Sequence, residues 1–238
     1  MKTFLLVSLS ALLSPALCGR VLFNGCSTDQ QFQINLYLRD VKLISEAAVR
    51  YAGDPKFNAW FGKDIASASD EKIKKRFNGF TFLPNSVPVK DVTFDCFGHA
   101  RCCTAGTGSV PACGDKSGDD QVNICSGFWN WQRQHVYELP GPDSFTNEAI
   151  DVKYRTRGYV LLHELTHSQF GTIDQREDVR DKDGNTVGCR GYGQFCVLKT
   201  AQKSSEKARK NADTYALFAL ASYYGLDKFQ TNPDKLKN

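Results

Sequence analysis

The chain has 238 residues, of which 41% are hydrophobic and 24% charged, and its formal net charge at pH 7 is +4. This length and composition allow one well-formed core or two small lobes. Basic residues are scattered among acidic ones except in one cluster between Lys199 and Lys210, so the sequence excludes the concentrated basic surface of a nucleic-acid-binding protein.

The N-terminus has the pattern of a secretory signal peptide. A basic residue precedes an apolar run from Phe4 to Leu13, and Ala16 and Cys18 are small residues suited to the positions before a cleavage site. That run is too short to cross a bilayer, and no later apolar segment reaches the necessary length. We therefore expect residues 1–18 to be removed, residues 19–238 to form one domain, and the mature protein to be secreted and extracellular, with no membrane partner.

The cysteine count supports the same compartment. Cys18 would leave with the signal peptide, and the remaining eight form an even set, which predicts four disulfides in a secreted protein. Their pairing does not follow from the sequence, although Cys189 with Cys196 would close a small loop around Tyr192. A zinc ribbon is the competing use of cysteines, but the chain contains no CxxC motif. The eight are Cys26, Cys96, Cys102, Cys103, Cys113, Cys125, Cys189 and Cys196.

Three helices are predicted in the first third of the chain. The first runs from Cys26 to Ala52, where Ser27 or Thr28 can cap its start and apolar residues recur on one face. A second, aromatic-rich helical segment covers Pro55 to Gly62, and a third begins at Ser69. Together these helices should form one lobe.

The pattern changes between residues 81 and 136, where short β-prone runs are separated by turn residues. These runs are 81–83, 89–96 and 121–125. Residues 102–120 are rich in Gly, Ser, Asp and Pro, so we expect a loop there that the cysteines cross-link.

The last third is predicted to contain two helices separated by an irregular segment. An apolar run at residues 158–162 belongs to the first helix, and residues 171–193 are polar and acidic. A final helix is expected from about Ser204 to Tyr224, with Ser205 as its cap and small residues packing against the preceding helix.

The apolar run leads into residues 163–167, which read HELTH. On a helix, residues four apart share one face, so His163 and His167 can aim their imidazoles at one point. Neutral imidazole nitrogens bind zinc there at about 2.0–2.1 Å. Glu164 leans over the same edge and is placed to accept a proton from a water at the metal rather than to bind the metal. The spacing therefore predicts a zinc centre with Glu164 as the general base.

A catalytic zinc ion needs a third protein ligand and an open fourth position. The two remaining histidines, His99 and His135, lie upstream and are expected to be surface or loop residues. A metzincin would need histidine where the chain has Ile173. A thermolysin-like site would need a glutamate on a downstream helix, where Glu206 is the candidate and its polar surroundings indicate exposure. The residues alone leave the third ligand open.

Several segments resemble the deuterolysin, or aspzincin, family. Three residues after HELTH, residues 171–174 read GTID. This resembles the family pattern, in which HExxH is followed by Gly-Thr-x-Asp. Residues 211–216 read NADTYA and resemble the family's C-terminal signature. Further similarities lie at residues 26–31, 57–63, 75–77 and 122–128, so the resemblance covers most of residues 26–224.

The resemblance implies Asp174 as the third ligand of one zinc ion, and hydrolysis of internal peptide bonds in protein or peptide substrates. It also implies an α+β, zincin-like fold that is mostly helical, disulfide-stabilised and built with a small antiparallel sheet. Residues 121–125 are then expected to form the edge strand that accepts the substrate. The domain from residue 19 onwards would be a catalytic domain, which we expect to be monomeric.

Two features depart from the family pattern. The family carries Tyr and Gly three and four residues after the ligand aspartate, and that tyrosine hydrogen-bonds the tetrahedral oxyanion, but this chain has Glu177 and Asp178 there. The nearest Tyr-Gly pair begins at Tyr192, which we expect either to act as the catalytic oxyanion donor or to be a structural loop residue. The family's long pro-segment is also expected to be absent.

Other acidic residues leave alternatives open. Asp178 and Asp181 are possible ligands in place of Asp174, although solvated loop carboxylates are their simpler interpretation. Asp213 could orient a ligand histidine as a hydrogen-bond acceptor or serve helix packing. The acidic residues within 171–193 could attract a basic substrate side chain.

An alternative function belongs to another class. A secreted binding protein could keep the fold and the zinc ion but have lost turnover, and the absence of a tyrosine at position 177 is the main support for this hypothesis. Comparing the wild type with Glu164→Gln separates the two, because a pure binder should behave identically in both forms.

Overall fold

The computed structural model describes residues 19–63, 67–104, 111–114, 120–130, 135–138, 150 and 155–236. The signal peptide expected at residues 1–18 lies outside these ranges, as do parts of the loop expected at residues 102–120. No described helix is long and apolar enough to cross a membrane.

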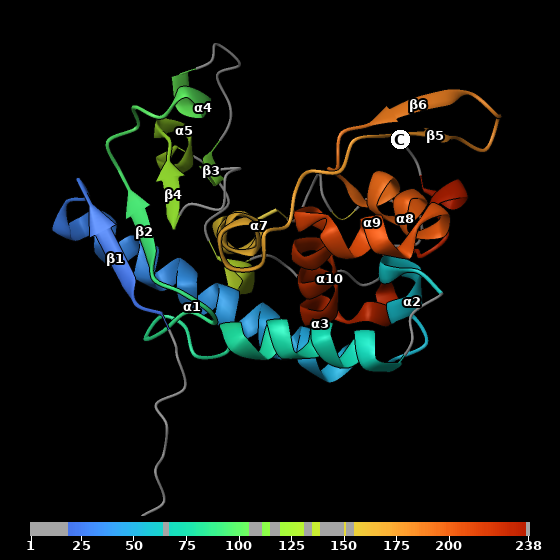
Figure 1. The fold of residues 1–238 in the computed structure, drawn as a ribbon, viewed down its shortest axis with the longest axis horizontal. Helices are drawn as coiled ribbons and strands as arrows, with labels where there is room; N and C mark the ends of the chain where they lie inside the picture. Colours follow the sequence, from blue (N-terminus) through green and yellow to red (C-terminus); the bar gives the residue numbers. More distant parts are fainter. Residues whose placement is uncertain are drawn as a thin grey trace, which may run out of the picture.

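Four helices form the main packed layer of the molecule. α1 (Thr28–Tyr51) packs against α3 (Ser67–Phe80), α7 (Arg157–Phe170) and α10 (Ala212–Tyr224), and α7 also packs against α10. Figure 1 shows α7 nearly end-on at the centre, between the strands on one side and α10 on the other. The shorter helices are α2 (Phe57–Phe61), α4 (Arg101–Thr104), α5 (Ser126–Trp129), α8 (Gln194–Lys203), α9 (Ser205–Lys210) and the 3-10 turns η1 (Val136–Glu138), η2 (Leu226–Lys228) and η3 (Pro233–Lys235).

The N-terminal helices form where the sequence predicts them. Ser27 accepts a hydrogen bond from the Gln30 amide while the Gln30 side chain accepts one from the Ser27 amide, a reciprocal cap that starts α1. The helix ends at Tyr51, just before Gly53, which adopts a positive φ of 95°. Capping therefore places α1 as expected, and its apolar face is buried against its three neighbours.

The sheet differs from the expected antiparallel one. Its strands are β1 (Val21–Asn24), β2 (Val92–Asp95), β3 (Ala112–Gly114) and β4 (Gln121–Ile124), in the order β1-β2-β4-β3. β1 pairs with β2 and β2 with β4 in parallel, and only β3 pairs antiparallel, with β4. The parallel pairing arises because α1, α2 and α3 carry the chain back between β1 and β2, a crossover that parallel strands require.

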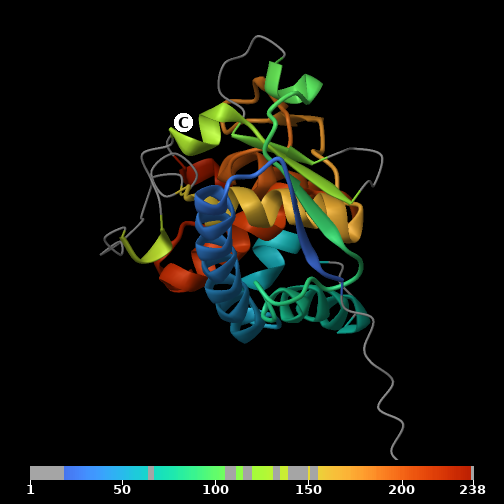
Figure 2. The ribbon, with the colours of Figure 1, turned by 90° about the vertical axis from the view of Figure 1, so that its left-hand side faces the viewer.

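The expectation that residues 121–125 form the edge strand is wrong. β4 lies between β2 and β3, and the edge on that side is β3, which lies within the segment expected to be a loop. Residues 81–83, expected to be β-prone, form a turn. Both β3 and β4 contact α7, and Figure 2 shows the sheet in front of that helix.

The C-terminal region also departs from the expected pattern. The single helix expected from Ser204 to Tyr224 is broken into α9 and α10 at Asn211, whose backbone is extended. Ser204, not Ser205, caps α9 by accepting a hydrogen bond from the Lys207 amide. The segment expected to be irregular contains an antiparallel hairpin of β5 (Glu177–Arg180) and β6 (Thr186–Cys189), followed by α8.

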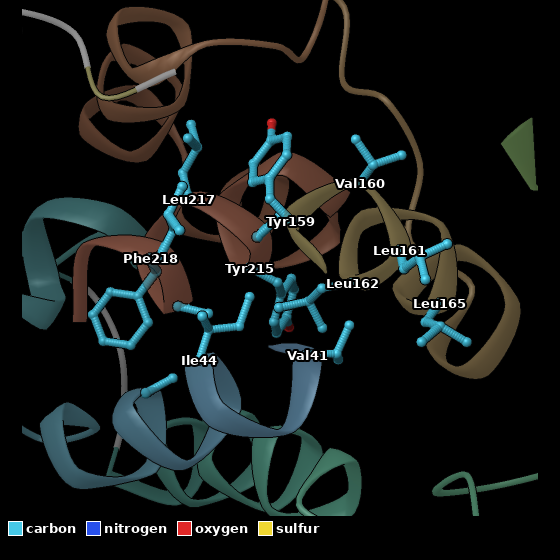
Figure 3. Packing of buried hydrophobic residues seen from close by; sticks show 14 of the residues in the cluster. Val41, Ile44, Tyr159, Val160, Leu161, Leu162, Leu165, Tyr215, Leu217 and Phe218 are labelled. Atoms are coloured by element: carbon cyan, nitrogen blue, oxygen red, sulfur yellow. The ribbon is translucent and has the colours of Figure 1, made fainter. Parts of the chain in front are cut away.

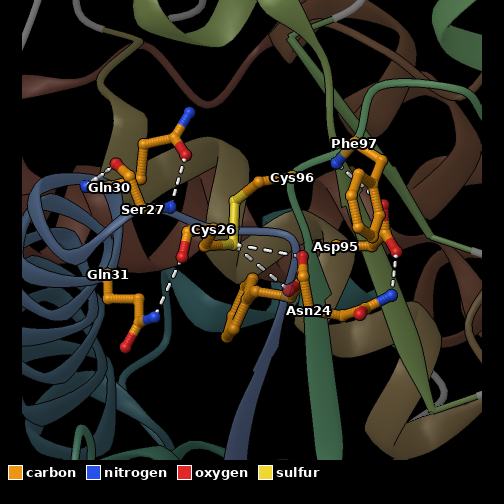
Figure 4. Close-up of a disulfide and its surroundings, with 9 residues drawn as sticks. Asn24, Cys26, Ser27, Gln30, Gln31, Asp95, Cys96 and Phe97 are labelled. Atoms are coloured by element: carbon orange, nitrogen blue, oxygen red, sulfur yellow. Dashed lines mark hydrogen bonds between the residues drawn. A yellow bond between two sulfur atoms is a disulfide. The ribbon is translucent and has the colours of Figure 1, made fainter.

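Four disulfides form, as the cysteine count predicts. Cys26–Cys96 joins the start of α1 to the end of β2, as Figure 4 shows. Cys102–Cys113 and Cys103–Cys125 tie the short helix α4 to the two strands β3 and β4. Cys189–Cys196 joins the end of the hairpin to the first turn of α8, which confirms the expected small loop around Tyr192.

The core is aromatic where α10 meets the N-terminal helices. Phe218 is fully buried, and its ring centroid lies 5.2 Å from that of Phe57, 5.4 Å from Phe61 and 5.8 Å from Phe77. Figure 3 shows Phe218 and Tyr215 of α10 facing residues of α1. This cluster fixes α10 against the rest of the core, and α10 in turn supports α7.

We expect Phe218→Ala to lower the free energy of unfolding by about 3–5 kcal/mol, because it removes a large buried ring and leaves a cavity. Denaturant unfolding with the disulfides intact measures this change. Phe32→Ala is the matched control, since Phe32 lies on α1 with 60% of its surface exposed, and its change should stay within about 0.5 kcal/mol. Equal losses in both variants would contradict this description of the core.

Candidate metal centre

Helix α7 carries the HELTH segment on a buried, sharply bounded helix. Thr156 caps its start by accepting a hydrogen bond from the Tyr159 amide. Gly171 ends it in the left-handed conformation, with φ 61°, and donates its amide to the His167 carbonyl. A glycine adopts this conformation without steric cost. The turn sends residues 172–174 back across the end of the helix, towards the two histidines.

Three potential ligand atoms converge at this place. His163 Nε2 and His167 Nε2 lie 3.1 Å apart, and Asp174 Oδ1 lies 3.2 Å from the first and 3.3 Å from the second. These three residues form a group whose ligand atoms all lie within 4.8 Å of one another. Ligands bound tetrahedrally to zinc at about 2.0 Å are separated by about 3.3 Å. The observed spacing therefore suits a small tetrahedral cation.

Hydrogen bonds on the far side of each imidazole fix which nitrogen faces the centre. His167 Nδ1 lies 2.6 Å from the Thr172 carbonyl oxygen, which can only accept, so this nitrogen carries the proton. His163 Nδ1 lies 3.2 Å from Asp213 Oδ1, another acceptor. When these rings are neutral, as metal ligands must be, each presents an Nε2 lone pair to the buried Asp174 Oδ1. Three electron pairs facing one point call for a cation, and this donor set fits zinc.

The charges around His163 favour a positive charge at the centre. Burial lowers the pKa of His163, but the Asp174 and Asp213 carboxylates outweigh it and raise the pKa to about 10. Burial likewise raises the pKa of Asp174, and the two histidines outweigh this and hold the pKa well below its ordinary value. The carboxylate therefore stays ionised and available as a ligand.

Asp213 links α10 to the ring nitrogen of His163 that faces away from Asp174. Its side chain is fully buried, and its Oδ1 faces His163 Nδ1 while Tyr159 donates its hydroxyl to the same oxygen. Its Oδ2 accepts the Gly193 amide at 2.7 Å. The sequence left two roles open for Asp213, and these contacts favour that of an acceptor that orients the His163 ring.

Tyr192 lies at the same centre, although it is far from HELTH in sequence. Its hydroxyl donates a hydrogen bond to Asp174 Oδ2 at 2.6 Å, and its ring stacks on His163 with the centroids 5.4 Å apart. Burial and the Asp174 carboxylate raise the pKa of the phenol, so it keeps its proton. Almost half of the side chain is exposed, which leaves it accessible from outside.

Glu177, which stands where the family has tyrosine, is not part of this group. Its carboxylate is nearly buried and pairs with Lys203 Nζ at 2.6 Å and with Lys207 Nζ at 3.1 Å. These two lysines lower the pKa of Glu177 against the opposing effect of burial. The residue anchors the β5–β6 hairpin on α8 and α9, so the tyrosine position has become a structural one.

Glu164 is buried on α7, next to His163. Its negative charge contributes to the raised pKa values of both His163 and Tyr192. Its carboxylate thus adds to the negative charge around the three converging atoms. It does not belong to that group of ligand atoms.

The alternative ligands suggested by the sequence lie elsewhere. Asp178 is exposed on β5, and Asp181 accepts the amides of Asp183 and Asn185 within the hairpin turn. Glu206 is exposed and pairs with Lys210, as its surroundings indicate. Another possible metal-binding group among the described residues is Cys102, Cys103 and Cys113, but their sulfur atoms are committed to disulfides.

The two other histidines have different environments. His99 is exposed and stacks on Phe97, as expected of a surface residue. His135 lies outside any helix or strand, as expected of a loop residue, but it is 6% exposed and its Nδ1 lies 2.9 Å from Asp40 Oδ2. Because Asp40 is on α1, 95 residues away, no local pattern could have indicated this pair.

Sequence reasoning missed two residues that shape the centre. The Thr172 carbonyl orients His167. The Asn211 side chain hydrogen-bonds the backbone of Gln175 and of Gly191. Thr172 and Asn211 both belong to the segments that resemble the family, GTID and NADTYA. That resemblance was the only signal in the sequence that could have drawn attention to them.

Comparisons with known proteins agree with this geometry. The aspzincin family model, described as lysine-specific metallo-endopeptidase, matches residues 46–220. No curated protein matches the chain. Among solved structures, the chain is similar to a zinc peptidase from Grifola frondosa, with 19% identity and a TM-score of 0.50, over 82% of this chain and 97% of that one. At this identity the likeness supports the fold, and the expected α+β zincin-like class is confirmed.

Proposed function

Since the chain belongs to the aspzincin family of zinc metalloendopeptidases, we propose that His163, His167 and Asp174 hold one zinc ion and that Glu164 is the general base. The observation that carries this proposal is the convergence of His163 Nε2, His167 Nε2 and a buried Asp174 carboxylate oxygen within 3.1–3.3 Å of one another. Three protein ligands leave the fourth position open, as catalysis requires.

In this proposal the side chains divide the work of peptide hydrolysis. Zinc, when bound, acidifies a water molecule and polarises the scissile carbonyl group. Glu164 would take a proton from the attacking water and would deliver it to the leaving amine as the peptide C–N bond breaks.

Tyr192 is proposed as the donor that stabilises the oxyanion. Its phenol reaches Asp174 Oδ2 and keeps its proton, so a short movement would let it donate to a substrate oxygen beside the zinc ligands. A donor placed at a developing oxyanion contributes on the order of 10²–10³-fold in turnover. Tyr192 thus takes over a role that the family gives to a tyrosine at the position of Glu177.

This arrangement weakens the alternative of a non-catalytic binding protein. That alternative depended mainly on the absence of a tyrosine at position 177, and a phenol is nevertheless present 2.6 Å from the proposed ligand Asp174. No other observation favours a loss of turnover.

Secretion and substrate class form the second part of the proposal. Four disulfides support an oxidising compartment, and we propose residues 1–18 as the signal peptide and residues 19–238 as the catalytic domain. The substrate is a protein or peptide. Attraction of a basic substrate side chain to the 171–193 segment would depend on Asp178, because Glu177, Asp181 and Asp183 already have partners within the protein.

Removing the metal tests this function directly. The purified protein with one equivalent of zinc should cleave unfolded casein at internal bonds, a chelator should abolish the cleavage, and added zinc should restore it. Mass spectrometry of the digest reports both cleavage and bond preference. A protein with full zinc occupancy that cleaves no protein substrate from mildly acidic to mildly alkaline pH would contradict the proposal.

A further inference from the structure

We propose that Asn211 is a positioning residue that sets the placement of Tyr192 relative to Asp174. This inference rests on the proposed function, in which Asp174 is a zinc ligand and Tyr192 the oxyanion donor. Asn211 touches neither of those side chains, so it would act only through the backbone segments that carry them.

One side-chain amide bridges the two segments. Asn211 Oδ1 accepts the Gln175 amide at 3.2 Å, immediately after Asp174, and Asn211 Nδ2 donates to the Gly191 carbonyl at 3.0 Å, immediately before Tyr192. The Asn211 side chain is fully buried, so water cannot easily replace either bond. The two functional residues are 18 positions apart in sequence, and this bridge joins their backbones directly.

Asn211 does not make the usual contact for its position in the fold. It is the residue that precedes α10, where an asparagine side chain normally accepts an amide of the first helical turn and stabilises the helix by about 1 kcal/mol. Here the side chain makes no such capping bond. Ser204, at the equivalent position of α9, does cap its helix. The polar atoms of Asn211 are directed instead towards the two segments of the candidate metal centre.

The backbone around Asn211 is also fastened to the Asp174 segment. Ile173 donates its amide to the Lys210 carbonyl at 2.7 Å, and the Ala212 amide donates to the Ile173 carbonyl at 3.1 Å. Asn211 therefore has a fixed position relative to Asp174. What its Nδ2 group adds is the connection to the Tyr192 segment.

The Tyr192 segment is held at both ends from the start of α10. Asn211 binds the Gly191 carbonyl, and Asp213 accepts the Gly193 amide at 2.7 Å. A Cβ atom on Gly191 would lie 2.7 Å from the Gln175 nitrogen and 2.9 Å from the Asp174 carbonyl carbon, so the two segments are in close contact. With both neighbours of Tyr192 fixed in this way, its phenol is directed to Asp174 and His163.

The bridge requires a neutral group with an acceptor on one side and a donor on the other. Asn211→Asp keeps an oxygen for the Gln175 amide but sets a second oxygen against the Gly191 carbonyl, and the two would repel each other. We expect the Asp174 segment, with the zinc ligands, to stay in place and the Tyr192 segment to move. A misplacement of about 1 Å costs on the order of 10²-fold in rate.

A double-mutant cycle in the zinc-loaded full-length enzyme tests this inference. Zinc content, melting temperature, kcat and KM are measured for the wild type, Asn211→Asp, Tyr192→Phe and the double variant. We expect Asn211→Asp to lower kcat by about 10–100-fold and Tyr192→Phe by about 10²–10³-fold, with zinc content and KM nearly unchanged. The double variant should match Tyr192→Phe within about threefold, because the effect of Asn211 passes through the phenol.

Thr214→Val is the matched control. It removes the second partner of Asn211 Nδ2, the Thr214 hydroxyl at 3.2 Å, but leaves the bridge intact, so kcat should stay close to the wild-type value. If Asn211→Asp does not fold, Asn211→Ser enters the same cycle, since its shorter side chain can cap α10 but cannot span both segments.

The possible failures are distinguishable. Losses that multiply in the double variant, or a wild-type kcat for Asn211→Asp, would overturn the role of Asn211 while leaving the proposed function in place. A fully active Tyr192→Phe enzyme would instead overturn the proposed oxyanion donor, and the positioning role with it. Loss of zinc from Asn211→Asp would also overturn the inference, because it would place the effect at Asp174.

Discussion

Glu164→Gln is expected to lower kcat by on the order of 10²–10⁴-fold while the protein keeps its zinc ion. The amide has nearly the size of the carboxylate but cannot accept a proton from the attacking water, so the general-base contribution is lost. The two proposed ligands on α7 are unchanged, and Glu164 is not among the three converging atoms. Zinc analysis by mass spectrometry and kinetics on an internally quenched peptide give both values in one preparation.

Glu206→Gln is the matched control for this variant. Glu206 is a helical glutamate whose carboxylate is exposed and paired with Lys210, and it is the residue that a thermolysin-like site would have used as a ligand. The activity and zinc content of the Glu206→Gln variant should equal those of the wild type. A Glu164→Gln protein with unchanged kcat would rule out Glu164 as the base and would revive the interpretation of the chain as a binding protein.

Asp174→Asn should weaken zinc binding by more than about 100-fold and abolish activity at limiting zinc. Replacing a residue that only hydrogen-bonds a metal ligand changes metal affinity by about 10–100-fold. Asp174→Asn should have a larger effect, because it removes the negative charge that directly faces the two Nε2 atoms. Competition with a chromogenic zinc chelator measures the affinity. The loss should be largest when the free zinc concentration is buffered low.

Asp178→Asn separates the proposed ligand from its nearest alternative. Asp178 lies four residues further along the same segment, exposed on β5, and its loss should leave zinc affinity unchanged. Tight zinc binding by Asp174→Asn together with weak binding by Asp178→Asn would show that the wrong aspartate has been assigned.

The parts of the centre that follow from short-range geometry could be predicted from the sequence. A spacing of four residues places His163 and His167 on one face of any helix, and the structure confirms the helix and their proximity. The position of Asp174 depends on a glycine turn directly after that helix, which the GTID segment indicates. The disulfide between Cys189 and Cys196 is similarly local.

The parts that depend on distant contacts could not be predicted in the same way. Tyr192 reaches Asp174 only because the β5–β6 hairpin carries the chain out and back. The ends of that hairpin are fixed by Glu177 with Lys203 and by Cys189 with Cys196. No spacing rule encodes such a return. The resemblance to the family identified the missing tyrosine, and Tyr192 was expected as its replacement only because it begins the nearest Tyr-Gly pair.

The errors in the fold have the same origin. β4 lies inside the sheet because β3, a strand of three residues centred on Cys113, pairs with it. Three residues give too little periodicity to indicate a strand. The break at Asn211 was missed because the contacts that hold its side chain, to Gln175 and Gly191, come from segments far from it in sequence.

A crystal structure of the zinc-loaded protein, with anomalous data at the zinc edge, tests the central claim most directly. The account predicts one strong peak within about 2.0–2.2 Å of His163 Nε2, His167 Nε2 and Asp174 Oδ1, with the Glu164 carboxylate nearby but not bound. A zinc ion held elsewhere, or an Asp174 carboxylate that points away from the two imidazoles, would contradict it.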